Sequence, residues 1–200
     1  MLLFLHVTGT VVIFSGIATL IFGLAALRLA STVEQVRAIA RPLVFGRKVG
    51  LEHISVIDVV TMIGIALTAA SGLYMAREGG FGRGWIEAGI ASFALMAPVG
   101  PLVINPRLHR IANTAETATL GPLPGNLRAR VHDPWLSAAL LTLTAWLLGI
   151  VFLMTTKPSL AVSVVAMLIA FAFGGVVSLA ELRFGRAEPD PSRPESLSGR

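Results

Sequence analysis

The chain has 200 residues, of which 54% are hydrophobic and only 14% are charged, and it contains no cysteine. Soluble domains carry roughly 25% charged residues, so the composition excludes an ordinary cytosolic enzyme and a disordered chain. The lack of cysteine excludes disulfides, iron–sulfur clusters and thiolate metal sites. Long apolar runs instead predict a polytopic membrane protein.

Five stretches are long enough to cross a bilayer, which takes about 20 helical residues. They cover about residues 2–27, 53–76, 85–106, 134–156 and 159–182. None of them alternates apolar and polar residues as the strand of a membrane barrel does. The sequence therefore predicts an all-α transmembrane bundle over residues 1–186, with a four-helix core and one additional C-terminal helix.

The basic residues predict the orientation of these spans. Thirteen of the sixteen Lys and Arg residues lie in the loops after the first and third spans and in the C-terminal tail. The other three are Arg77, Arg83 and Lys157. Because basic loops stay in the cytoplasm, we expect the N-terminus outside and the C-terminus inside, in a bacterial inner membrane. The net charge of +5 then reflects topology, and no nucleic-acid partner is expected.

Three further segments have distinct patterns. Residues 31–44 predict an amphipathic helix, which would either lie on anionic lipid headgroups or form a solvated connector. Pro98 and Pro101 predict a kink in the third span, serving packing or opening a lateral cleft. Residues 187–200 are rich in proline, serine and charge, which predicts a disordered cytoplasmic tail.

Charged and strongly polar side chains are few in the predicted spans, and four of them are candidates: His6, Asp58, Glu87 and Asn105. Intramembrane ionisable groups are costly and therefore mark candidate functional sites. By depth, His6 pairs with Glu87 near the outer face, and Asp58 pairs with Asn105 or Arg107 near the inner face. Glu87 is shallow enough to reach water.

The two ionisable residues His6 and Asp58 each have two interpretations. His6 has either a functional role, as a ligand of haem iron or copper or as a proton carrier, or a structural one, bonded to a neighbouring helix or at the interface. No second histidine lies at its depth, so it could act only as a lone axial haem ligand. Asp58 is either a proton or cation site or a structural acceptor joining the inner ends of two helices.

Small residues recur at helical spacing in three spans. Gly9, Gly16 and Gly23 repeat every seven residues, Gly64 and Gly72 frame Thr68, and Gly174 lies between Ala170 and Ser178. Such stripes let helices approach closely, so they predict packing inside the bundle. They could also form a dimer face, or a shelf for a flat ligand such as haem or a quinone.

Motifs of catalysis are absent from the sequence. It has no H-E-x-x-H pair, no phosphate-binding loop and no nucleophile elbow, so we expect no catalytic residues and no metal cluster. No charge lies at the middle of any span, which disfavours an ion-coupled transporter.

Several short motifs resemble a known family. They are Leu5-His6-Val7-Thr8-Gly9 with Ser15-Gly16, Thr68-Ala69-Ala70-Ser71-Gly72-Leu73, Gly84-Trp85, Pro106-Arg107-Leu108 and Phe152-Leu153-Met154. Over about residues 1–158 the chain resembles a bacterial family of uncharacterised integral membrane proteins, similar in pattern to CopD-type copper-resistance proteins and HemJ-type protoporphyrinogen oxidases. These relatives imply haem or copper at the early histidine, here His6. The HemJ-type activity is associated with a lysine inside the helix bundle. The chain departs from this pattern, because its two lysines, Lys48 and Lys157, both lie outside the spans.

Three functions follow as hypotheses. The first is a non-enzymatic accessory or assembly component of the inner membrane, acting with a partner complex or as a homo-oligomer. The second is a haem- or metal-binding redox protein that uses His6. The third is a small transporter or permease-like protein.

Overall fold

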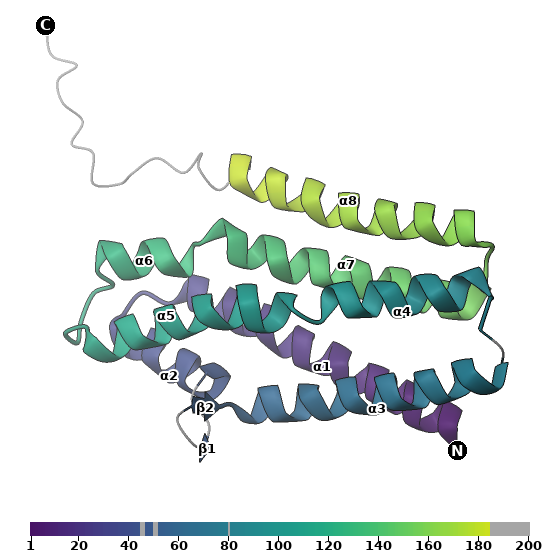
Figure 1. The fold of residues 1–200 in the computed structure, drawn as a ribbon. Coiled ribbons are helices and arrows are strands. Elements are labelled where there is room, and N and C mark those ends of the chain that lie inside the picture. The colour runs from purple at the N-terminus through teal and green to yellow at the C-terminus, as the bar shows by residue number, and fades with distance from the viewer. Residues whose placement is uncertain (45–46, 50–51, 80, 185–200) are drawn as a thin grey trace, which may run out of the picture.

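The structure is a computed structural model that describes residues 1–44, 47–49, 52–79 and 81–184. The expected disordered tail and the domain boundary at residue 186 lie outside the described residues. In the described part, long helices run side by side along one axis (Figure 1).

Five helical runs are long and apolar enough to cross a membrane, as the sequence predicts. Three of them correspond to single helices, which are α1 (Leu2–Leu29), α3 (Val56–Gly79) and α8 (Leu160–Phe184). A fourth, Gly125–Thr156, contains α7 (Pro134–Thr156) after a short preceding helix. The remaining run, Gly84–Thr117, is longer than the predicted third span because the helix continues beyond the apolar segment.

The Gly84–Thr117 run is interrupted where the prolines predict a kink. It consists of α4 (Gly84–Met96), a π-helical turn η1 (Gly100–Ile104) and α5 (Asn105–Thr117). Pro98 and Pro101 have no N–H to donate, and the backbone N–H of Asn105 reaches the carbonyl of Gly100. The kink is therefore confirmed, and Figure 1 shows the break between α4 and α5.

The second span begins later than predicted. A short antiparallel hairpin, β1 (Arg47–Val49) and β2 (Glu52–Ile54), occupies the preceding residues. Helix α3 starts only at Val56, because Ser55 and Asp58 form a reciprocal cap at its first turn. The expected helix start at residue 53 was therefore wrong by three residues.

Close helix contacts involve the glycines expected to pack. On α1, Gly9 faces Gly64 and Thr68 of α3, and Gly16 faces Thr61. A Cβ added at Gly9 would lie 2.8 Å from the carbonyl oxygen of Gly64. These contacts join α1 and α3 along their length.

The other glycines of the stripes also meet neighbouring elements. Gly72 lies against the His6 ring, and Gly174 of α8 lies against Thr142 of α7. Gly23 lies against Leu43 of helix α2 (Val33–Val44). Gly149 of α7, which was not among the expected positions, packs against Met167 and Ala170 of α8.

We call the end of the molecule that carries Arg37, Arg41 and Arg110 the basic end. It has its own hydrophobic core. Helix α2, α5 and the short helix α6 (Gly125–Val131) pack there around the ends of α1 and α7. The apolar side chains of α2, including Val33, Val36 and Leu43, are buried in this core. Helix α2 therefore neither presents its apolar face to lipid nor forms a solvated connector, since α5 covers that face.

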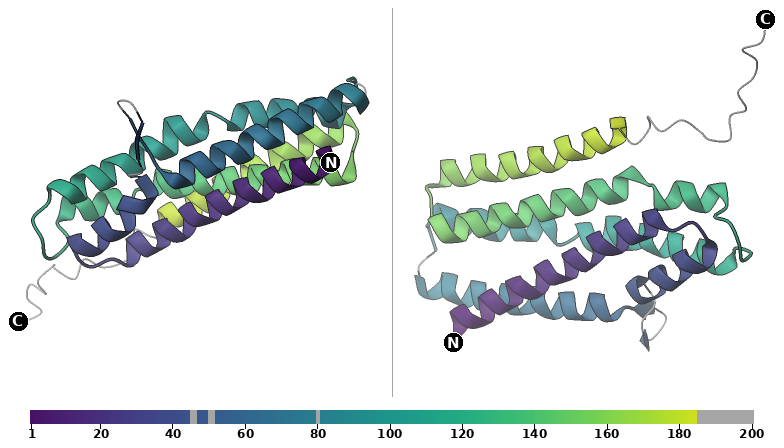
Figure 2. Two further views of the ribbon diagram at one scale, coloured as in Figure 1. Left: turned by 90° about the horizontal axis from the view of Figure 1, so that it is seen from below. Right: turned by 180° about the vertical axis from the view of Figure 1, so that it is seen from behind.

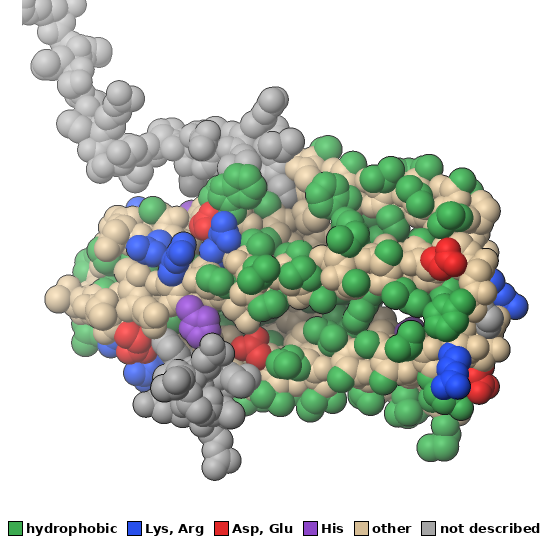
Figure 3. Space-filling view, viewed as in Figure 1, with side chains coloured by type: hydrophobic (Ala, Val, Ile, Leu, Met, Phe, Trp, Pro, Cys, Tyr) green, Lys and Arg blue, Asp and Glu red, His purple; other side chains and the backbone are tan. Residues whose placement is uncertain are grey.

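Helix α3 is a peripheral helix. It packs lengthwise on α1, whereas it does not pack along α4, the next helix in the chain. In its most apolar window 17% of the residues are buried, against 39% in that of the α7 run. Figure 2 shows the same arrangement from two further sides, and Figure 3 shows the surface hollowed between α3 and α4. We call this hollow the α3–α4 groove.

Candidate functional site

His6 is held against α3 by its ring nitrogen. Its Nδ1 lies 3.1 Å from the carbonyl oxygen of Thr68 and 3.3 Å from Oγ of Ser71. Because a carbonyl oxygen can only accept, Nδ1 carries the proton and donates to Thr68. The other ring nitrogen, Nε2, has no hydrogen-bond partner among the described residues. Histidines that bind metals are oriented by such a carbonyl bond.

The ring of His6 lies in the contact between α1 and α3. Its imidazole Cε1 would lie 3.0 Å from a Cβ at Gly72, so the glycine leaves room for the ring. The hydroxyl of Thr68 is buried without a partner in the described structure, and it lies against Gly9 at the helix contact. Across the described ranges, no three His, Cys, Asp or Glu residues gather as metal ligands.

Asp58 and Arg107 have separate partners. The Asp58 carboxylate accepts from Oγ of Ser55 at 2.9 Å and serves as part of the α3 cap. Arg107 donates from Nε to Asp133 at 3.2 Å, and Asp133 caps α7 by accepting from the N–H of Trp135. The depth match between Asp58 and Arg107 is therefore not a contact, because a local cap satisfies one residue and a helix junction satisfies the other.

Glu87 and Asn105 contribute less to the site. Glu87 is exposed in the first turn of α4, where the helix dipole favours a negative charge. Its depth match with His6 is not a contact, because the hydrogen bonds of His6 go to α3. Asn105 is half-buried at the start of α5, directly after the π-helical turn.

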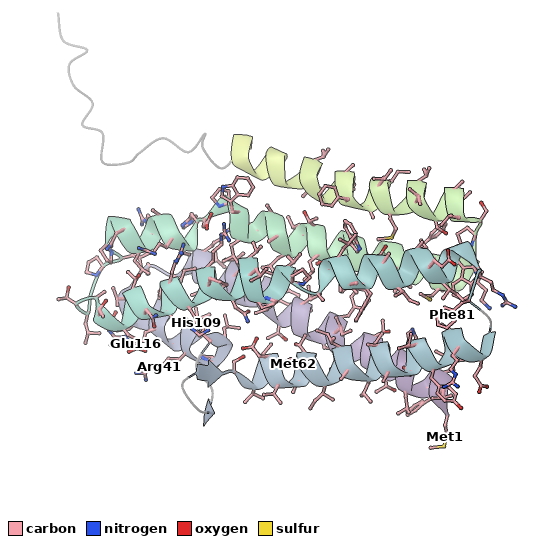
Figure 4. The ribbon with its side chains drawn as sticks, in the orientation of Figure 1. Met1, Arg41, Met62, Phe81, His109 and Glu116 are labelled. Atoms are coloured by element: carbon pink, nitrogen blue, oxygen red, sulfur yellow. The ribbon has the colours of Figure 1, made fainter. Side chains whose placement is uncertain are left out.

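Arg37 is a polar anchor that sequence reasoning missed. From α2 it donates to the carbonyls of Ala115, Glu116 and Ala118, and its shortest bond, to Ala115, is 2.8 Å. These are unpaired carbonyls at the end of α5, which a cation stabilises. One turn later Arg41 pairs with Glu116 at 2.7 Å, and the hydrogen bond that Arg41 donates to this carboxylate raises the pKa of Arg41 (Figure 4). The amphipathic pattern of α2 alone could have indicated a helix partner, although not which one.

A shallow open groove also runs between α1 and α2. Its lining includes Ser15, Thr19, Phe22, Ile39 and Leu43. Both hydroxyls are bonded to carbonyls of their own helix, with Ser15 on Val11 and Thr19 on Ser15. The groove therefore offers apolar surface and no convergent polar group that would fix a small ligand.

The comparison with protein families agrees with the membrane fold. The family model described as "Predicted integral membrane protein (DUF2269)" matches residues 1–158. The chain belongs to this family. The DUF2269 match ends two residues before α8, so α8 lies outside the matched residues. No curated protein and no solved structure matches the chain, so the likeness to CopD-type and HemJ-type proteins stays an expectation.

Proposed function

We propose that this DUF2269 protein is a non-enzymatic component of the bacterial inner membrane that binds the transmembrane helix of a partner protein in the α3–α4 groove. The N-terminus faces outward and the C-terminus inward, since α2, α5 and α6 place their arginines at one end. The observation that carries the proposal is the packing of α3 on α1, which leaves the side of α3 toward α4 uncovered.

The polar residues support a binding role over a catalytic one. His6, Asp58, Arg37 and Arg107 each bond a structural partner such as a cap, a carbonyl or a helix junction. The proposal therefore assigns these groups to holding the bundle. The transport hypothesis receives no support, because the ionisable residues of the described spans lie near span ends.

The groove side of α3 has the character of a helix-binding surface. Met62 is 63% exposed, and Figure 4 places it on the side of α3 that faces α4 and α5. Ile65 and Ala69 follow at helical spacing, and Ile65 packs against the hydrophobic cluster that includes Ile13 and Ile17 of α1. A flexible methionine beside small and aliphatic residues suits an apolar helix.

Site-directed cross-linking tests the groove, because the chain has no cysteine of its own. Met62→Cys and Ala69→Cys, each labelled with a maleimide photo-crosslinker in native membranes, should capture the same single chain. A captured second copy of the 21.1 kDa chain would identify the partner as a homo-oligomer. The yield of adduct on a denaturing gel is the measurement.

Val60→Cys is the matched control. Val60 lies two residues before Met62 on the opposite side of α3, and it is 44% exposed. It should react with the maleimide but capture no chain. Equal capture at Val60 and Met62, or capture at neither groove position, would refute a partner helix in the groove.

His6 supports a second candidate, a haem-binding redox protein. Its Nδ1–H is anchored on Thr68, so Nε2 is the atom that would bind iron. A bound haem would supply one-electron transfer. The Thr68 carbonyl of α3 would keep the imidazole proton on Nδ1, so that Nε2 faces the iron.

Absorption spectroscopy tests this second candidate. Protein purified in mild detergent from haem-replete cells should show a Soret band that shifts on reduction. His6→Ala should remove that band, whereas Ser71→Ala should keep it because the Thr68 carbonyl still orients the ring. A colourless wild-type protein, or a band that survives in His6→Ala, would rule out His6 as the ligand.

A further inference from the structure

A pocket of about 400 Å³ lies at the C-terminal end of α3. Its lining is formed by Ala70, Leu73, Tyr74 and Arg77 of α3 and by Phe81 of the loop that leads to α4. The four α3 residues share one side of the helix, because they occupy positions i, i+3, i+4 and i+7. Figure 4 shows Phe81 at the turn between α3 and α4, so the helix and the loop form the pocket together. We call it the α3 end pocket.

Arg77 gives this pocket its charge. It is the one charged residue among the described residues of the lining, and its side chain is exposed. The ion pairs in the described part of the chain involve Arg37, Arg41 and Arg107 instead. The α3 end pocket therefore combines a guanidinium that no described carboxylate neutralises with walls that are apolar and aromatic.

The pocket lies where α3 leaves the apolar part of the span. Arg77 is in the last turn of this helix, and Tyr74 precedes it by three residues. Trp85 is in the first turn of α4 at the same end. Tyrosine and tryptophan prefer the interface between lipid and water, and the long stem of an arginine lets its guanidinium reach the headgroups. The α3 end pocket is therefore expected at the headgroup level of one leaflet.

We propose that the α3 end pocket binds one anionic phospholipid of the adjacent leaflet, with its phosphate on Arg77. A guanidinium matches two phosphate oxygens with parallel N–H groups. Ala70 and Leu73 form an apolar floor for the acyl chains, and the rings of Tyr74 and Phe81, which are 48% and 59% exposed, lie beside the glycerol. The pocket thus fits a molecule that carries both an anion and a chain, whereas a free phosphate or a diacylglycerol matches only half of it.

This lipid site does not depend on the partner helix proposed above. Ala69 is the partner-binding position nearest to it, and Arg77 lies about 12 Å further along α3, at 1.5 Å per residue. A phosphate on Arg77 therefore requires no helix in the α3–α4 groove.

Native mass spectrometry of the detergent-solubilised full chain tests the proposal. The probes are phosphatidylglycerol, the diacylglycerol with the same acyl chains, and soluble glycerol phosphate. Phosphatidylglycerol should give one retained lipid. It should bind at least about ten-fold more tightly than either of the other two, because only it uses both the guanidinium and the apolar floor.

Two variants separate the halves of the pocket. Arg77→Gln should lower the affinity for phosphatidylglycerol by about ten-fold and leave that for diacylglycerol unchanged, because diacylglycerol has no phosphate. Phe81→Ala should lower the affinity for both lipids by roughly three-fold, because it removes an apolar wall.

Arg83→Gln is the matched control. Arg83 is an exposed arginine at the same end of the molecule, and it does not line the pocket. Its removal should leave the affinity for phosphatidylglycerol unchanged. The melting temperature of Arg77→Gln without added lipid should equal that of the wild type, since the side chain is exposed. If Arg77→Gln melts lower, Phe81→Ala in the loop decides instead.

Four results would overturn the proposal. They are equal affinity for phosphatidylglycerol and diacylglycerol, unchanged affinity in Arg77→Gln, equal losses in Arg77→Gln and Arg83→Gln, and full competition by glycerol phosphate. Equal losses in the two arginine variants would indicate general attraction to positive charge. Full competition would indicate a free-anion site in place of a lipid site.

Discussion

Gly9→Leu should separate α1 from α3 and cost about 3 kcal/mol of stability, or prevent folding. A Cβ at this position would lie 2.5 Å from Oγ1 of Thr68 and 2.9 Å from the backbone nitrogen of the same residue. Backbone atoms cannot rotate away, so the two helices must move apart. Unfolding of the purified protein in mixed micelles, followed by tryptophan fluorescence, measures the loss.

Two further glycine variants calibrate this result. Gly16→Leu should cost less, because the nearest neighbour of Gly16 is the side chain of Thr61, which can change rotamer. Gly175→Leu on α8 should cause no loss, since nothing lies within 4 Å of a Cβ there. Similar stability for Gly9→Leu and Gly175→Leu would show that α1 and α3 are not in the close contact described.

Arg37→Gln should destabilise the basic end by about 2–3 kcal/mol, because charged hydrogen bonds are worth more than neutral ones. The substitution removes the guanidinium that bonds Ala115, Glu116 and Ala118 at the end of α5. The Arg37 side chain is 24% exposed, so water replaces it poorly. The midpoint of denaturant unfolding and hydrogen exchange at the end of α5 are the measurements.

Arg41→Gln is the matched control on the same helix. Both arginines form an ion pair with Glu116, at 3.7 Å for Arg37 and 2.7 Å for Arg41. The pair of Arg41 is the shorter of the two, but the Arg41 side chain is 62% exposed. Exposed ion pairs contribute about 0–1 kcal/mol, so the loss should be small. An equal loss for both variants would indicate that pairing with Glu116, and not the bonds to the carbonyls, explains the role of Arg37.

Much of the candidate site was accessible from the sequence, but its contacts were not. The rarity of ionisable residues in the spans singled out His6 and Asp58. Depth matching then suggested Glu87 and Arg107 as partners, whereas the bonds go to Thr68 and Ser55. Depth gives a position along the membrane normal, while a contact also requires the facing sides of two helices.

The sequence by itself determined the class of protein, the five spans and the kink at Pro98 and Pro101. These features follow from composition and local backbone chemistry: apolar length sets a span, and a missing N–H breaks a helix. The tertiary structure alone decided that α2 is buried by α5, that Arg37 bonds the end of α5, and that α3 packs on α1 and leaves a groove toward α4. An apolar face is buried equally well by lipid or by protein, so only the packed fold distinguishes the two.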